Sequence, residues 1–185
     1  MKSSNGFEIE EIDTVKVHMG DQSCELPLIE GSEGERALDI SRLRAETGVI
    51  TLDEGFVNTG STRSAITFLD GEKGVLRYRG YPIEKLAASC DFIETAFLLI
   101  YGELPNAKEL ETFRAGIREH TMLHQDMKSF YNGFPRDAHP MAILASVVGA
   151  LSTFYQDSLD LNDERQVEIS IYRLLAKLPT IAAYS

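Results

Sequence analysis

The sequence has few cysteines, few basic residues and no long hydrophobic run, and each shortage argues against a class of protein. Only Cys24 and Cys90 are present, far apart and outside any C-x-x-C motif, which argues against a disulfide framework, a zinc site or a redox pair. No apolar run approaches the roughly 18 residues of a membrane-spanning helix. The first six residues lack the apolar stretch of a signal peptide, so we expect a soluble, cytoplasmic chain with free thiols.

Basic residues are outnumbered: 18 lysines and arginines face 29 acidic residues, and the net charge is −11. Much of the excess lies in residues 1–35, which hold nine acidic residues and two lysines. Nucleic acids and anionic membranes require clustered Lys and Arg side chains. We therefore expect neither as a partner, and we interpret the acidic start as a solvated segment.

The chain of 185 residues, 43% of them hydrophobic, has room for about one domain and a core without disulfides or metals. Patterns of period two and turn residues predict a β-rich first part. The expected elements are strands over Thr14–Met19 and Cys24–Leu26 around a turn at Gly20-Asp21, the second ending before Pro27, a helical stretch over Ala37–Thr47 that stops at Gly48, and a hairpin of Ser64–Leu69 and Val75–Tyr78.

From Tyr81 onward the sequence predicts helices. Two of them begin with residues typical of a capping box, Asp91 with Glu94 and Asn106 with Glu109. The expected helices run from Pro82 to Ala88, from Asp91 to Gly102, from Asn106 to about His124, from Met141 to about Tyr155, and from Asn162-Asp163 to the end. The last one still has its amphipathic pattern at Ser185, so we expect the chain to stop inside an element.

Two pairs of polar residues have spacings that occur in catalytic or metal sites, but both favour ordinary structural roles. His120 and His124 are four residues apart, as in helical zinc sites, but Thr121 replaces the general-base glutamate, so we expect no metal. Asp137 stands two residues before His139, where an N-cap role for Asp137 or a local hydrogen bond to the helix start is favoured over a catalytic dyad.

A third pair, Arg173 and Lys177, lies four residues apart on the last predicted helix. Such a pair usually marks a solvated face, and an anion site is the alternative. The sequence contains neither a G-x-S-x-G nucleophile elbow nor a phosphate-binding loop, and Gly71–Gly74 reads as a hairpin turn. The residues by themselves therefore predict a folded scaffold without a catalytic constellation.

Five collinear blocks carry a resemblance to a known family. They are Ile66–Gly71 with Gly74–Ile83, Phe97–Pro105, His120–Met122, Phe134–Met141 and Leu174–Thr180. In sequence, order and spacing they closely resemble the amino-terminal part of citrate synthase. The acidic, β-rich start resembles the extra amino-terminal domain of the type II, hexamer-forming bacterial enzymes, which include NADH-sensitive members.

The resemblance implies a mainly α fold, with citrate synthase large-domain helices preceded by a small β-rich domain. Residues 1–60 would form the small domain and residues 61–185 the first part of the large one. The family condenses acetyl-CoA with oxaloacetate to give citrate and CoA, and it requires no cofactor. Its catalytic residues lie in the carboxy-terminal half, so the resemblance implies that this chain is an amino-terminal portion, inactive alone and without catalytic residues.

The resemblance also implies assembly and regulation. The helix from Met141 to Tyr155 matches the one that packs against its twin in the family dimer, and small residues such as Ala142, Ala145, Gly149 and Ala150 permit close approach. In NADH-inhibited members the nucleotide is held by residues matching His120, Thr121, Met122, Tyr155, Arg173 and Lys177.

One departure weakens the nucleotide site. NADH-inhibited members carry Arg directly before His-Thr-Met, whereas this chain has Glu119 there, with Arg118 one position earlier. A helix turns about 100° per residue, so Arg118 does not substitute, and a carboxylate near a phosphate is unfavourable. Two alternatives stay open: a fragment of 2-methylcitrate synthase, which uses propionyl-CoA, and a non-catalytic assembly or regulatory module on the same scaffold.

Overall fold

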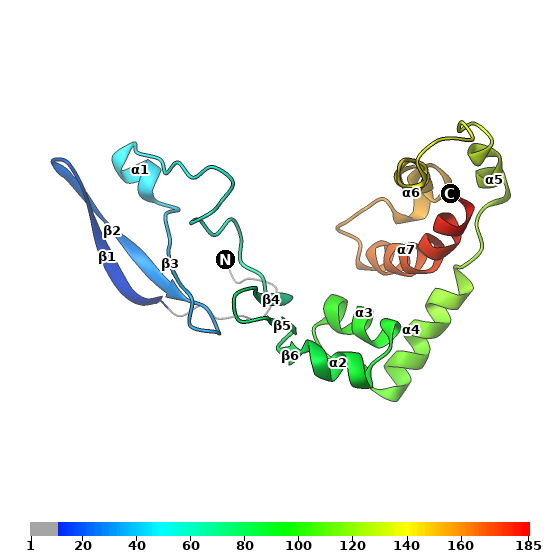
Figure 1. Ribbon diagram of the computed structural model, residues 1–185, viewed down its shortest axis with the longest axis horizontal. Coiled ribbons are helices and arrows are strands. Elements are labelled where there is room, and N and C mark those ends of the chain that lie inside the picture. Colours follow the sequence, from blue (N-terminus) through cyan, green and yellow to red (C-terminus); the bar gives the residue numbers. More distant parts are fainter. Residues whose placement is uncertain (1–10) are drawn as a thin grey trace. The chain divides into compact units, whose positions relative to one another are not determined.

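The computed structural model describes residues 11–185, which divide into two compact units between Thr67 and Phe68 (Figure 1). The described chain has two three-stranded sheets and is predominantly helical in its second unit, which agrees with the predicted mixture of a mainly α part and a β-rich start. The domain boundary expected after residue 60 stays a prediction. No helix within residues 11–185 is both long and apolar enough to cross a membrane.

The first unit is built on an antiparallel sheet with strand order β1-β2-β3. Its elements are β1 (Glu11–Met19), β2 (Gln22–Glu30), β3 (Arg36–Leu38) and the short helix α1 (Leu43–Thr47). The turn predicted at Gly20-Asp21 joins β1 to β2, and Gly20 has a φ of +63°, which glycine adopts without strain. Strand β2 does not end before Pro27, because Pro27 stays in register opposite Thr14.

A small core lies between this sheet and α1. Cys24 and Leu26 alternate with exposed residues on β2 and pack with Leu43, and all three are buried. The helix predicted over Ala37–Thr47 is wrong in its first half, because Arg36–Leu38 pairs with β2 as a strand. Its predicted stop is confirmed: Gly48 has a φ of 76° and its N–H donates to the carbonyl of Arg44.

The second sheet has the order β4-β5-β6 and leads into the helices. It contains β4 (Thr67–Asp70), β5 (Val75–Tyr78) and β6 (Tyr81–Pro82), so the first strand of the predicted hairpin begins later than Ser64. Arg79 and Gly80 form the tight turn from β5 to β6 with φ values of 49° and 85°. Both positive values are those of a type I′ turn, which matches the twist of paired strands.

The helices are α2 (Ile83–Ser89), α3 (Phe92–Tyr101), α4 (Ala107–Glu119), α5 (Gln125–Tyr131), α6 (Pro140–Phe154) and α7 (Glu164–Tyr184), with a 3₁₀ turn, η1 (Gln156–Ser158), before α7. Both predicted capping boxes are confirmed, at Asp91 with Glu94 and at Asn106 with Glu109. The helix expected to reach His124 is wrong at its end, because α4 stops at Glu119 and a new helix begins after His124.

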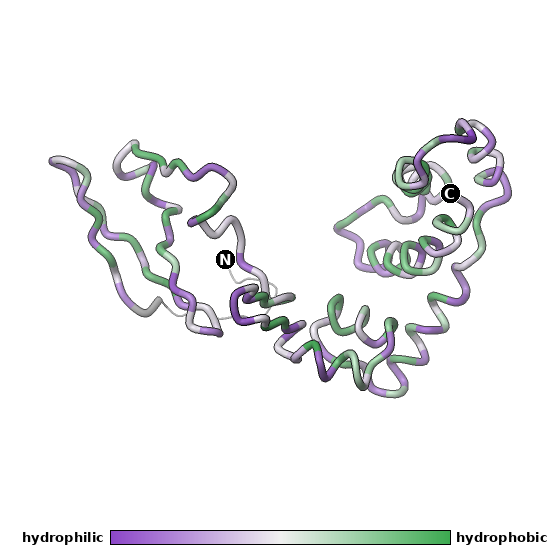
Figure 2. The backbone as a smooth tube through the Cα atoms, in the orientation of Figure 1, coloured by the Kyte–Doolittle hydropathy of each residue, from purple (hydrophilic) through white to green (hydrophobic). Residues whose placement is uncertain are grey.

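Two clusters of side chains hold the helices together. An aliphatic core is shared by the α4–α5 connection, α5, α6 and α7, and its members are Leu123, Met127, Ile143, Val147, Leu151 and Ile181. Phe97, Tyr101, Phe113 and Tyr172 form an aromatic cluster from α3, α4 and α7, with ring centroids 4.5–5.9 Å apart. Hydrophobic residues recur between hydrophilic ones along α7 in Figure 2, as expected of a helix that contributes one face to both clusters.

Candidate functional site

Lys177 lies at the centre of the predicted site and is almost entirely buried, with 2% of its surface exposed. Its Nζ donates hydrogen bonds to the carbonyl oxygens of His120 and Met122, both at 2.6 Å. These carbonyls follow the end of α4, where backbone acceptors have no partner within the helix and where a cation is favourable. Lys177 therefore holds the α4–α5 connection against α7, and a solvated position for its side chain is wrong.

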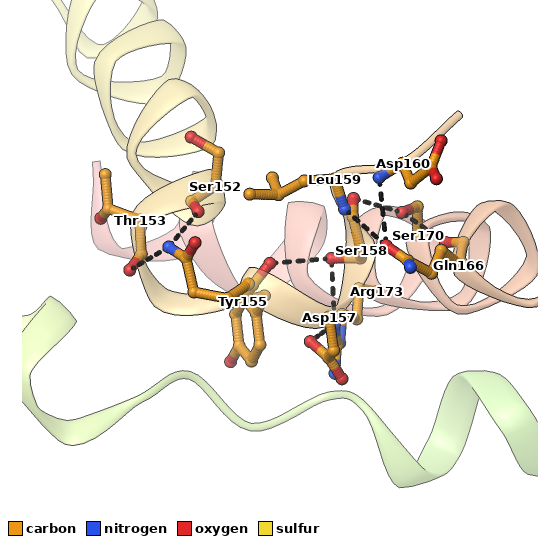
Figure 3. A network of polar contacts seen from close by, with 11 residues as sticks. Ser152, Thr153, Tyr155, Asp157, Ser158, Leu159, Asp160, Gln166, Ser170 and Arg173 are labelled. Atoms are coloured by element: carbon orange, nitrogen blue, oxygen red, sulfur yellow. Dashed lines mark hydrogen bonds and ion pairs between the residues drawn. The ribbon is translucent and has the colours of Figure 1, made fainter. Parts of the chain in front are cut away.

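Arg173, one turn earlier on α7, is bound by acidic and hydroxyl groups (Figure 3). Its two Nη atoms donate to the two carboxylate oxygens of Asp157 at 2.7 and 2.8 Å, and Nη1 also donates to Ser158 Oγ at 3.0 Å. This hydrogen bonding from Arg173 holds the pKa of Asp157 below its usual value. Only 12% of the Arg173 side chain is exposed against 62% for Asp157, so the carboxylate covers a largely buried guanidinium.

The segment that carries Asp157 is itself fastened to α7. The Gln166 side-chain oxygen accepts from the backbone N–H groups of Leu159 and Asp160, each at 3.1 Å. Ser170 Oγ lies 3.2 Å from the carbonyl of Ser158 (Figure 3). These contacts place η1 beside α7 and thereby set the position of Asp157 opposite Arg173.

Tyr155, which follows α6, brings the two cations together. The Arg173 Cζ lies 4.4 Å from the centre of the Tyr155 ring, and the Lys177 Nζ lies 5.0 Å from it. Both distances are within the range of cation–π attraction. An aromatic face bordered by two cations has the chemical character of a site for an anion with an aromatic group, although both cations already have partners within the chain.

The remaining predicted residues border the same place. His120 Nδ1 lies 2.8 Å from the carbonyl of Gly116, which assigns the ring proton to Nδ1, and the ring stacks on Tyr172 at 6.3 Å. Thr121 accepts through its carbonyl from Thr180 Oγ1 at 3.5 Å. The structure thus gathers His120, Thr121, Met122, Tyr155, Arg173 and Lys177 at the junction of α4, α6 and α7, whereas nucleotide binding by them stays a prediction.

The resemblance places a basic residue directly before His120, where this chain has Glu119 preceded by Arg118. Glu119 is exposed at the last position of α4. Arg118 lies 3.8 Å from Glu111 in an exposed ion pair, so its guanidinium is directed along α4. The basic residue that the resemblance places before His120 is therefore not supplied by Arg118.

The sequence did not predict a cleft of about 490 Å³ beside the aromatic cluster. Its walls include Phe97, Tyr101, Phe113 and Tyr172, with Lys108 and Glu168 among the polar groups. The Tyr172 hydroxyl donates to Glu168 at 2.9 Å, and burial raises the pKa of Tyr172 to about 12. The sequence pattern that could have indicated this cleft is the pair Phe97 and Tyr101, which are four residues apart and thus on one helix face.

The residues of the pairs His120–His124 and Asp137–His139 do not form the metal site or the catalytic dyad that their spacing could suggest. His124 is the N-cap of α5 and His120 follows the end of α4, so the two do not share a helix and the helical zinc spacing does not apply. The N-cap of α6 is His139, and the expected N-cap role of Asp137 is wrong. Within residues 11–185, no three His, Cys, Asp or Glu side chains are grouped so as to hold a metal ion.

Comparison with known proteins identifies the family to which the chain belongs. A family model described as "Citrate synthase, C-terminal domain" matches residues 55–185, which is more than half of the chain. The chain belongs to the citrate synthase family. The resemblance found in the sequence blocks is thereby confirmed at the level of the family, whereas the type II class and an amino-terminal position stay predictions.

Relatives of known sequence and structure agree with this membership. The chain is 52% identical over 173 residues to citrate synthase 1 of Mycobacterium tuberculosis, covering 94% of this chain and 40% of that protein. It is 51% identical to citrate synthase of Corynebacterium glutamicum over 91% of this chain and 39% of that one. The citrate synthase structure from Pyrobaculum aerophilum matches with a TM-score of 0.60 and 25% identity, covering 93% of this chain and 40% of its own. The chain spans about 40% of these relatives.

Proposed function

We propose that the full-length protein containing this chain is a citrate synthase, which condenses acetyl-CoA with oxaloacetate to give citrate and CoA. The observation that carries the proposal is 52% identity over nearly the whole chain to a protein of that name. We place the chain as the amino-terminal portion of a type II enzyme. The sheet of the first unit, which precedes the family match, supports that class.

The role proposed for this chain is structural and regulatory, with the catalytic residues outside it. Self-association, as a dimer or hexamer of the full protein, is proposed through α6. Ile143, Val147 and Leu151 bury one face of this helix in the aliphatic core, while Ala145 and Gly149 are exposed on another. Small exposed residues let a second helix approach closely, which supports packing of α6 against its copy.

An allosteric NADH site is proposed at the six gathered residues. Supporting it, Arg173 and Lys177 lie within 5.0 Å of the same aromatic ring, and the phosphates of a dinucleotide require cations. Two features determine its strength. Asp157 holds Arg173 in a two-point contact that a phosphate would have to replace, and Glu119 supplies a negative charge at the end of α4.

The decisive experiment measures release of the CoA thiol by the full-length protein with oxaloacetate and either acetyl-CoA or propionyl-CoA. We expect turnover that prefers acetyl-CoA, and none by the 185-residue chain alone. A preference for propionyl-CoA would instead identify a 2-methylcitrate synthase. Failure of the full-length protein with both thioesters would favour the non-catalytic module, and turnover by the short chain would contradict the assignment of catalysis to residues outside it.

A further inference from the structure

The second unit has a cleft of about 490 Å³ that the proposed nucleotide site leaves unused. It is bordered by α3, α4 and the first half of α7, and its size is within the range of roughly 300–1,000 Å³ that is typical of small-molecule sites. All four rings of the aromatic cluster line it, and Tyr101 keeps 45% of its surface exposed. Part of the aromatic surface is therefore open to a ligand.

Two carboxylates line the same cleft from different helices, and each is held in place by a hydrogen bond. Glu109 Oε2 accepts from the backbone N–H of Asn106 at 2.8 Å, which closes the capping box of α4. Glu168 Oε1 accepts from the Tyr172 hydroxyl at 2.9 Å. Within residues 11–185 neither carboxylate forms an ion pair, so each keeps an oxygen atom available to a ligand.

The charge of the cleft is negative. Its lining contains one lysine, Lys108, against the two glutamates. Burial raises the pKa of Tyr101 and of Tyr172, and the Glu168 carboxylate raises both further, so the two phenols stay uncharged near neutral pH. The two carboxylates are not part of a metal site, because no group of three His, Cys, Asp or Glu side chains suited to a metal ion exists among the described residues. The lining therefore favours an organic cation over an anion or a metal ion.

Aromatic rings and carboxylates together suit one class of ligand. Alkylated ammonium ions combine a positive charge with an apolar surface, and proteins recognise them with the faces of aromatic rings. We propose that this cleft binds an organic ammonium ion, whose apolar groups contact the aromatic cluster and whose charge faces Glu109 and Glu168. The proposal depends on neither the catalytic nor the nucleotide-binding function proposed above.

Saturation-transfer difference NMR on the full-length protein tests the proposal, with choline as the probe. Its uncharged isostere dimethylbutanol, in which a carbon atom replaces the nitrogen, is titrated in parallel. We expect choline to bind about fivefold more tightly than the isostere, the factor expected for one charge contact in water. Equal affinities would show that the cleft is only an apolar groove, and absence of choline binding would show that it takes no ammonium ion. Either result would overturn the proposal.

Two sets of variants assign the binding to this cleft. Glu168→Gln keeps an acceptor for the Tyr172 hydroxyl but removes the charge, so choline should bind about fivefold more weakly. Glu164→Gln makes the same change one turn earlier on α7, at an exposed position outside the cleft, and should leave the affinity unchanged. Tyr101→Leu should weaken binding about threefold, whereas Tyr101→Phe keeps the ring and should not. Equal losses in the two Gln variants, or an equal affinity in the two Tyr101 variants, would contradict the site.

Discussion

The ring of Tyr172 lies so close to Gly116 that a Cβ at position 116 would come within 2.8 Å of the ring atoms Cε1 and Cζ. Glycine inside α4 is unfavourable by roughly 0.5–1 kcal/mol relative to alanine, so its presence here requires a cause. Close approach of α7 to α4 supplies that cause. The contact also positions the His120 ring, which bonds to the carbonyl of Gly116 and stacks on Tyr172.

We predict that Gly116→Ala destabilises the full-length protein by about 1–3 kcal/mol, the usual cost of overpacking, despite the better helix propensity of alanine. Urea unfolding measures the change. The double variant Gly116→Ala with Tyr172→Leu removes the ring that the new methyl group would meet. The destabilisation of the double variant should therefore be smaller than the sum of the destabilisations of the two single variants. Strict additivity would contradict the close contact.

Lys177→Met should also destabilise the protein, by about 1–3 kcal/mol, because it leaves the carbonyls of His120 and Met122 without their donor. Methionine keeps most of the apolar volume, so the change isolates the ammonium group. Lys108→Met is the matched control, since Lys108 is exposed on α4, and its effect should stay within about 0.5 kcal/mol. Equal urea midpoints for the two variants would contradict the role assigned to Lys177.

The starts of α3 and α4 could be predicted because a capping box is complete within four residues. Asp91 and Asn106 each bond to a backbone N–H three positions later, and the glutamate that closes each box is visible in the sequence. The end of α4 could not be predicted in the same way. Its final carbonyls are satisfied by Lys177, 57 residues after His120, and such a partner is brought into place only by tertiary packing.

The candidate site shows the same division between local and distant causes. The four-residue spacing of Arg173 and Lys177 predicts that they share one side of a helix. It does not predict which groups bind them. Asp157 reaches Arg173 because Gln166 binds the backbone just after η1, a contact without a recognised sequence pattern. Strand pairing similarly explains why β2 continues through Pro27: β3 lies alongside, and the carbonyl of Pro27 accepts from the N–H of Asp39.

Asp157 should contribute a pH-dependent part of the stability. Arg173 lowers its folded-state pKa below the ordinary value of 3.8, so its contribution is present above that value and is lost as pH falls through the folded pKa. The thermal midpoint of Asp157→Asn should therefore lie below that of the wild-type protein at pH 6, and the difference should shrink as pH falls below 3.8. Asp137→Asn, at an exposed position, is the control and should show no such convergence.

Replacement of Glu119 tests the charge argument at the proposed nucleotide site. Glu119→Arg should bind NADH about fivefold more tightly than the full-length wild-type protein in a fluorescence titration, a change equivalent to ~1 kcal/mol and typical of one charge contact in water. Glu119→Gln should give a smaller gain, because it removes the negative charge without adding a positive one. Glu103→Arg makes the same change of charge in the exposed loop before α4, at the opposite end of that helix, and should leave the affinity unchanged. An equal gain from Glu103→Arg would indicate general electrostatic attraction, and absence of NADH binding in every variant would contradict the nucleotide site itself.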